Sequence, residues 1–152
     1  MKNTIILLLS LVSLMSCSSG DDTVKGCTDP VSANYNADAT ENDNSCQYSI
    51  VGNWRIVKFT NGSTNILSVY SSLNMNILSN GTTSTYGVLT DGSTRSVNGT
   101  YLISGSDNST LTLTNTNGDS TVWTFIDITS TSFSITSSNL NGQPATIEGV
   151  KI

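Results

Sequence analysis

The sequence contains no histidine, and charged residues make up only 11% of its 152 positions. The absence of histidine removes the most common general base and the most common protein ligand for transition metals. Six lysines and arginines face eleven acidic residues, for a net charge of −5, and the bases form no stripe along the chain. Such a chain cannot neutralise a run of phosphates, so we expect no nucleic-acid partner.

Catalytic groups are also scarce. Asp91, Asp107 and Asp119 fall within turn sequences, where a solvated cap is the ordinary role of an aspartate. Asp127 and Glu148 lie within expected strands and would meet as an acid–base pair only through a particular register. The sequence therefore predicts a protein without enzymatic activity and without a cofactor.

No apolar run is long enough to cross a bilayer, but a short one stands near the beginning. Lys2 precedes residues 5–12 (IILLLSLV), and Leu-Met-Ser-Cys ends this stretch at Cys17. A membrane-spanning helix takes about 20 apolar residues, so a processed signal fits better. The pattern resembles the lipobox of bacterial lipoproteins, with an ordinary secretory signal as the alternative. That resemblance implies cleavage after residue 16 and acylation, including palmitate, at Cys17.

Residues 17–26 follow as a lipidated flexible tether, since they are small, polar and acidic. The stretch 18–22 (SSGDD) resembles the acidic signal that carries some Gram-negative lipoproteins to the outer face of the outer membrane. An unstructured spacer is the alternative. We expect an outer-membrane lipoprotein of the cell envelope whose lipid makes the membrane contact. If the acidic signal acts, the protein is exposed at the cell surface. The sequence leaves the oligomeric state open.

Residues 27–48 form a polar segment bracketed by Cys27 and Cys46. Two cysteines in an exported chain, with Cys17 acylated, predict a disulfide worth about 3 kcal/mol in the chain-entropy model. The segment resembles GCTDPxAxNYNPxAxxDDGSCxY, a motif of secreted bacterial proteins with no transferable function.

Calcium is one hypothesis for this segment, because five side chains there offer hard oxygen ligands: Asp29, Asn34, Asn36, Asp38 and Asp43. An EF-hand is excluded, because Ala39 replaces the required glycine and Ser45 stands where a bidentate glutamate is needed. The alternative is a disulfide-pinned loop whose Asx side chains bond their own backbone. This pattern alone does not identify any of the five residues as a metal ligand.

Residues 50–152 carry frequent Asn-Gly and Asp-Gly pairs, which suit tight hairpins. Between them we expect eight strands, at about 50–60, 69–78, 83–90, 96–104, 109–115, 120–128, 132–138 and 144–152. Several alternate apolar and polar residues, which gives each strand one buried face. Short strands joined by tight turns predict an all-β fold: an eight-stranded antiparallel up-and-down barrel after the disulfide-pinned segment.

Gly52-Asn53-Trp54 resembles the G-x-W motif that opens the first strand of lipocalin-like domains. The resemblance extends over about 100 residues of the kind found in bacterial lipocalin-like lipoproteins. It implies that Trp54 closes the barrel floor, with a basic side chain such as Lys151 packed against it.

A barrel of this size either fills with side chains or holds one small ligand. We therefore expect a non-catalytic protein that binds a small apolar or amphipathic molecule inside the barrel. The alternative is a structural or interaction module at the cell surface that contacts glycan or protein and has no internal ligand. Ten side chains are candidates for lining the ligand: Trp54, Leu73, Met75, Ile77, Tyr86, Val88, Tyr101, Ile103, Trp123 and Phe133.

Overall fold

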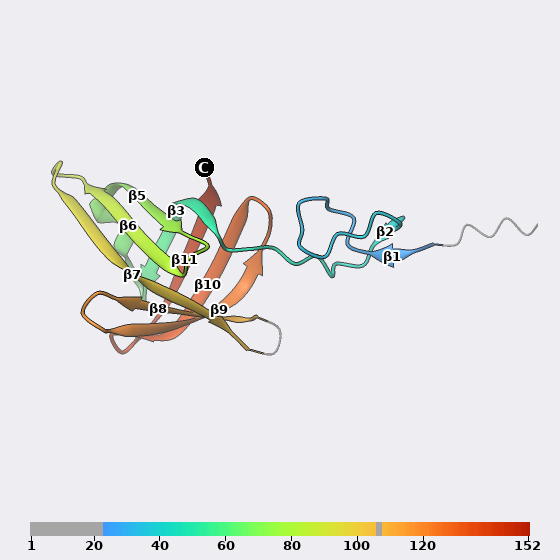
Figure 1. Ribbon diagram of the computed structural model, residues 1–152. Helices are drawn as coiled ribbons and strands as arrows, with labels where there is room; N and C mark the ends of the chain where they lie inside the picture. Colours follow the sequence, from blue (N-terminus) through green and yellow to red (C-terminus); the bar gives the residue numbers. More distant parts are fainter. Residues whose placement is uncertain (1–22, 106–107) are drawn as a thin grey trace, which may run out of the picture.

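The computed structural model describes residues 23–105 and 108–152. Cys17, the expected signal peptide and most of the tether lie outside the described residues. The N-terminal loop segment (residues 23–45) contains β1 (Lys25–Gly26) and β2 (Glu41–Asn42). A linker, residues 46–51, joins it to a barrel that holds the remaining strands (Figure 1). Within the described ranges, no helix has the length and apolar character needed to cross a membrane.

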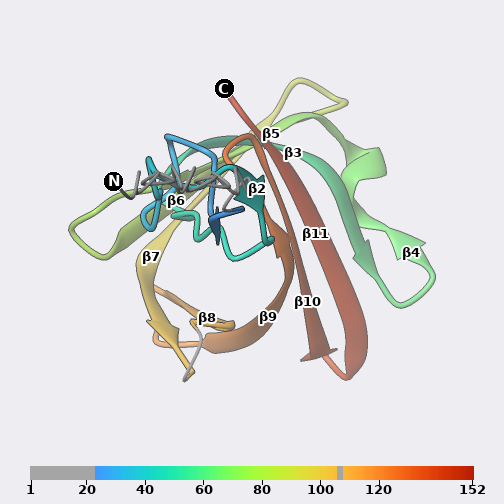
Figure 2. The ribbon, with the colours of Figure 1, turned by 90° about the vertical axis from the view of Figure 1, so that its right-hand side faces the viewer.

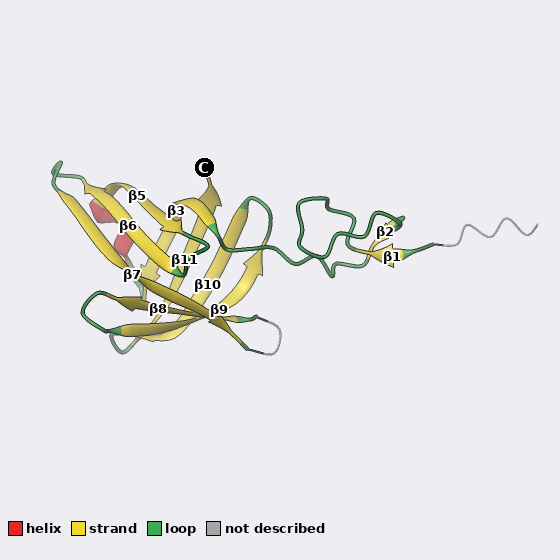
Figure 3. Ribbon diagram, in the orientation of Figure 1, coloured by secondary structure: helices red, strands yellow, loops and turns green. Residues whose placement is uncertain are grey.

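Eight antiparallel strands form the barrel (Figures 1 and 3). They are β3 (Gly52–Asn61), β5 (Tyr70–Ile77), β6 (Thr82–Leu89), β7 (Thr94–Ser104), β8 (Thr110–Asn115), β9 (Ser120–Ile128), β10 (Ser132–Leu140) and β11 (Gln143–Lys151). Each pairs with the next along the chain, and β11 pairs again with β3, so the sheet closes on itself. The expected all-β, eight-stranded up-and-down barrel is confirmed. Short β4 (Thr64–Asn65) and the 3-10 turn η1 (Ile66–Val69) connect β3 to β5.

Local sequence explains most strands and turns. In β5, Leu73, Met75 and Ile77 are buried in the barrel, and the asparagines between them take the opposite face. The turn between β10 and β11 needs two residues with positive φ, and Asn141 (53°) and Gly142 (82°) supply them. Alternation and turn chemistry therefore agree on the register of this region.

Strand β7 pairs with two different strands along its length. Its first half pairs with β6 and its second half with β8, with Gly99 at the change-over. A Cβ on Gly99 would collide with the backbone carbonyl oxygen of Thr114, so only glycine allows this approach of β7 and β8. The β8–β9 hairpin can then fold beneath the rest of the barrel (Figure 1).

Apolar side chains fill much of the barrel interior. Trp54 is fully buried, its Nε1 donates to the carbonyl oxygen of Ile50 at 2.7 Å, and Phe133 meets its ring edge-on at 5.0 Å. The Nζ of Lys151 lies 5.4 Å from the Trp54 ring centroid, as the G-x-W resemblance implies. The buried cluster consists of Ile50, Trp54, Ile56, Leu73, Met75, Ile77, Leu111, Trp123, Phe133, Ile135, Ala145 and Ile147.

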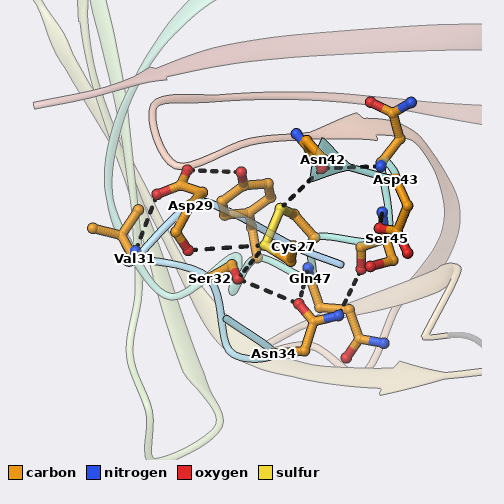
Figure 4. The surroundings of a disulfide bond; sticks show 12 residues. Cys27, Asp29, Val31, Ser32, Asn34, Asn42, Asp43, Ser45 and Gln47 are labelled. Atoms are coloured by element: carbon orange, nitrogen blue, oxygen red, sulfur yellow. Dashed lines mark hydrogen bonds between the residues drawn. A yellow bond between two sulfur atoms is a disulfide. The ribbon is translucent and has the colours of Figure 1, made fainter. Parts of the chain in front are cut away.

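The N-terminal loop segment has almost no apolar core and relies on other bonds. Cys27 and Cys46 form the expected disulfide, and Cys27 is 1% exposed (Figure 4). The side chain of Asn34 ties two stretches together, because its Oδ1 accepts from the N–H of Gln47 and its Nδ2 donates to the carbonyl oxygen of Ser45. The disulfide and the hydrogen bonds of the Asn34 side-chain amide thus stabilise this segment in place of a hydrophobic cluster.

Candidate functional site

A cavity lies at the end of the barrel where β3 begins and where β7 and β9 finish. Its volume is about 600 Å³, and it opens to solvent. One wall comes from the barrel strands and the other from the linker. We call this site the covered mouth. Its lining consists of residues 46–51 together with Tyr101, Ile103, Asn108, Ser109, Phe125, Ile126, Asp127 and Ile128.

Side chains alternate between the two faces of β7, and those of Tyr101 and Ile103 point into the barrel. Tyr101 and Ile103 pair with Leu113 and the buried Leu111, so all four share the interior face. The Oη of Tyr101 donates to the carbonyl oxygen of Leu78 at 3.0 Å, which fixes its ring across the rim.

A bulge in β9 shapes the same wall. Phe125 faces Ile135 in the core, and Asp127 is already paired with Ser134, which leaves Ile126 as the extra residue. Ile126 is consequently 66% exposed and borders the mouth together with Asp127. The bulge therefore places an exposed apolar side chain at the rim, while Asp127 shares the outer face of the sheet with Ser134.

The linker is held from both sides. On the outer side the Oη of Tyr48 donates to the Oδ2 of Asp29 at 2.7 Å, and the carbonyl oxygen of Gln47 accepts from the N–H of Ala33 at 2.8 Å. On the barrel side the carbonyl oxygen of Ile50 accepts from Trp54. In Figure 2, which views the barrel from the side of the N-terminal loop segment, that segment lies in front of part of the barrel.

The pKa values of two ionisable groups, Asp29 and Tyr48, are shifted by this attachment. The N–H of Val31, and then the hydroxyl of Tyr48, hold the pKa of Asp29 below its ordinary value. The same hydrogen bond to Asp29 raises the pKa of Tyr48. At neutral pH the pair is therefore a phenol donating to a carboxylate.

The structure separates the ten side chains that the sequence offered as ligand-lining. Six are buried in the packed interior: Trp54, Leu73, Met75, Ile77, Trp123 and Phe133. Tyr101 and Ile103 line the covered mouth. Tyr86 and Val88 take the outer face of β6, because they pair with Asn74 and Ser72.

That placement corrects the expected phase of β6. Opposite the buried Leu73 and Met75 stand Gly87 and Thr85, so threonine and glycine face the interior and Tyr86 is 48% exposed. Gly87 is required there, because a Cβ would lie 2.5 Å from the Tyr70 ring. The Tyr70 ring occupies the space that a side chain on β6 would otherwise fill.

Sequence reasoning missed the linker side of the mouth, including Tyr48 and Ile50, and most of the barrel side, including Phe125 and Ile128. The alternation Trp123-x-Phe125 was a signal for Phe125, because both side chains take the interior face. No local signal places the linker over the barrel, since its bonds to Asp29 and Trp54 depend on the tertiary fold.

A smaller cavity of about 180 Å³ lies toward the other end of the barrel, bordered by Met75, Thr85, Leu113 and Trp123 among others. The Nε1 of Trp123 is buried and has no hydrogen-bond partner in the described parts of the chain. An unpaired buried donor of this kind is destabilising by about 1–3 kcal/mol.

Four of the five candidate calcium ligands accept hydrogen bonds from backbone N–H groups of this region, among them Asp29, Asn34 and Asp43 (Figure 4). The Oδ1 atoms of Asp29, Asn36 and Asp43 each accept the backbone N–H two residues further on, which is the Asx-turn pattern. Among residues 23–105 and 108–152, no group of three or more His, Cys, Asp or Glu side chains could hold a metal ion. The Asx bonds account for the Oδ1 atoms of Asp29, Asn36 and Asp43 without a cation.

Comparison with solved structures bears on the fold. An uncharacterized protein from Bacteroides eggerthii is similar to this chain with a TM-score of 0.50 and 11% identity, over 68% of this chain and 100% of that one. A lipocalin-like protein from Bacteroides uniformis has a TM-score of 0.47 and 14% identity, over 67% of this chain and 97% of that one. No family model and no curated protein matches the sequence. At 11% identity the first likeness shows the fold alone.

Proposed function

We propose that this chain is a lipid-anchored protein of the cell envelope that binds a small apolar or amphipathic molecule in the covered mouth and catalyses no reaction. The observation that carries the binding proposal is the cavity of about 600 Å³, whose volume falls within the usual range for small-molecule sites. Its walls combine apolar side chains from the barrel with a few polar groups from the rim and linker.

The ligand position proposed here, in the covered mouth, differs from the one expected from the sequence. Trp54, Phe133 and Ile135 occupy the barrel interior and leave the mouth as the larger space. A bound molecule would contact Ile103 and Phe125 with its apolar part and the linker with its outer part. Closed barrels of about eight strands hold small ligands in comparable positions.

A titration with the neutral fluorescent probe N-phenylnaphthylamine tests binding at this site. In Ile103→Trp the larger side chain should occupy part of the cavity and weaken probe binding about tenfold or more. Leu102→Trp is the matched control, because Leu102 is 63% exposed on the opposite face of the same strand. Equal affinities for both variants, with unchanged far-ultraviolet circular dichroism, would place the probe elsewhere and overturn the proposal.

One surface supports the second candidate, an interaction module. Leu102 pairs with Thr112, which pairs with Val122, on the outer face of β7, β8 and β9. Leu102 and Val122 are 63% and 55% exposed in the middle of rows of threonine and serine. If this face binds glycan or protein, Val122→Lys should abolish attachment to envelope material and leave probe binding unchanged.

The anchor has a separate test, because Cys17 lies outside the described residues. In cells fed an alkyne analogue of palmitate, we expect the native chain to carry the label and to sediment with outer membranes. Cys17→Ser should lose both properties, whereas Ser18→Ala should keep them. An unlabelled native chain that is recovered free of membrane would refute the anchor.

A further inference from the structure

Strand β7 extends beyond its pairing with β6, so its last residues have a neighbouring strand on one side only. Contact with the β6 side ends where the N–H of Tyr101 donates to the carbonyl oxygen of Gly81 at 2.9 Å. The chain turns at residues 78–81, just where β6 would have to continue in order to reach Ile103. Pairing with β8, on the other side of β7, goes on as far as Ser104. The edge of β7 that faces away from β8 is therefore open beyond Tyr101.

The direction of each backbone group on β7 follows from the antiparallel pattern. The N–H and C=O of one residue point to the same side of a strand, and those of the next residue point to the other side. Since the N–H of Tyr101 points to the β6 side, the N–H and C=O of Ile103 point to that side as well. Leu102 and Ser104 bond to β8 instead, and Ile103 faces Leu111 as a non-hydrogen-bonded pair. The backbone donor and acceptor of Ile103 thus have no partner among the residues that the structure describes.

This open edge borders the covered mouth. Ile103 lines the cavity, together with the linker and with Phe125 and Ile128 of β9. Residues 101–104 (YLIS) include no charged residue and no proline, which are the residues that commonly protect a strand edge from pairing with another chain. The edge therefore retains the capacity to pair with a further strand, and a strand in that position lies beside the cavity.

We propose that the covered mouth binds a short extended peptide, which adds a strand to the open edge of β7 and places an apolar side chain in the cavity. The peptide residue opposite Ile103 exchanges both backbone hydrogen bonds with it, as in an antiparallel sheet. Side chains directly opposite one another share a face, so this residue points into the mouth, where Phe125 also lines the cavity.

The inference rests on the proposed function, because it names the ligand class of the same cavity. A peptide that alternates apolar and polar residues is an amphipathic molecule. A lipid without an amide group fills apolar space equally well, but it leaves the N–H and C=O of Ile103 without a matching acceptor and donor. The backbone edge is therefore the feature that favours a peptide.

The pentapeptide acetyl-Val-Thr-Phe-Thr-Val-amide is the probe, because its phenylalanine and both valines lie on one face when the chain is extended. It should bind in isothermal titration calorimetry and displace N-phenylnaphthylamine from the mouth. Methylation of the phenylalanine nitrogen removes the N–H aimed at Ile103 and should weaken binding about tenfold or more. Methylation of the next threonine nitrogen is the matched control. That N–H points away from β7, so the affinity should stay nearly unchanged.

Amide hydrogen exchange tests the same contact from the side of the protein, without a substitution. The N–H of Ile103 should be poorly protected in the free protein, and its protection factor should rise about tenfold or more when the pentapeptide is bound. The N–H of Leu102 is the internal control, because it bonds to β8. It should be protected with and without the peptide.

The outcomes separate the two proposals. If N-phenylnaphthylamine binds but the pentapeptide does not displace it, strand addition is wrong and the covered mouth remains a site for small molecules. If both methylated peptides bind as tightly as the parent, or if the protection of the Ile103 amide does not change, the peptide does not pair with β7 and the inference is also wrong. If neither the probe nor the pentapeptide binds, both the inference and the proposed ligand site fail.

Discussion

The two tryptophans offer a direct test of how the barrel is held together. Both are almost completely buried, Trp54 at 0% exposure and Trp123 at 3%, so replacement by phenylalanine removes a similar apolar volume from each position. The two indole N–H groups differ. That of Trp54 donates to the carbonyl oxygen of Ile50 at 2.7 Å, whereas that of Trp123 has no partner within the described ranges.

The expected costs follow from this difference. The lost ring volume should cost each variant roughly 1–1.5 kcal/mol. Trp54→Phe also removes the bond to the Ile50 carbonyl, worth about 1–3 kcal/mol, and weakens the contact with Lys151. Trp123→Phe removes an unsatisfied donor, which offsets part of its volume loss. We expect Trp54→Phe to lose about 3 kcal/mol and Trp123→Phe about 1 kcal/mol or less.

Urea unfolding followed by far-ultraviolet circular dichroism measures both losses without relying on tryptophan emission. The two variants should keep the native m-value, so that the midpoints report stability alone. Lys151→Gln should cost no more than about 1 kcal/mol, the value of a cation–π contact near the surface. Equal losses for the two tryptophan variants would refute the reasoning, because the Ile50 bond would then contribute nothing measurable.

Two further predictions concern the core and the linker. Gly149→Ala should destabilise the barrel by about 2–3 kcal/mol in urea unfolding, because a Cβ there collides with the Phe133 ring; adding Phe133→Leu should recover part of that loss, and strictly additive losses would contradict the clash. The Asp29 carboxylate, with its lowered pKa, stabilises the linker fully above pH 3.8, and this contribution should disappear as the pH falls through the lower folded-state pKa. The protection factor of the Gln47 amide, its intrinsic exchange rate divided by the observed rate, should therefore fall in acid for the native chain but not for Asp29→Asn, and identical profiles would refute the link.

Much of the barrel could be predicted because its signals are local. Pairs such as Asn141-Gly142 mark hairpins wherever they occur, and the alternation of Leu73, Met75 and Ile77 fixes the inner face of β5 without knowledge of its neighbours. Each of the eight expected ranges accordingly overlaps one observed strand. The disulfide was equally accessible, since it depends on the count of cysteines.

Strand β6 shows where such signals stop. Residues 82–85 read Thr-Thr-Ser-Thr, which carries no apolar alternation to set the inner face. The size of Tyr86 therefore predicts an inward side chain, whereas in the structure the Tyr70 ring fills the space over Gly87. The phase of β6 is decided by a residue on the neighbouring strand, and that information is absent from the β6 sequence itself.

The position of the candidate site follows from how the interior is filled. Trp54, Phe133 and Ile135 pack the barrel interior, so the covered mouth, where the strands end, offers a ligand more room than the interior does. At that end the linker supplies one wall, and its position depends on Tyr48 reaching Asp29 and on Trp54 reaching Ile50. The disulfide between Cys27 of the N-terminal loop segment and Cys46 of the linker thus helps to fix the outer attachment of the wall. Its fold and the shape of the covered mouth are therefore physically coupled, and a ligand that contacts the linker stabilises both.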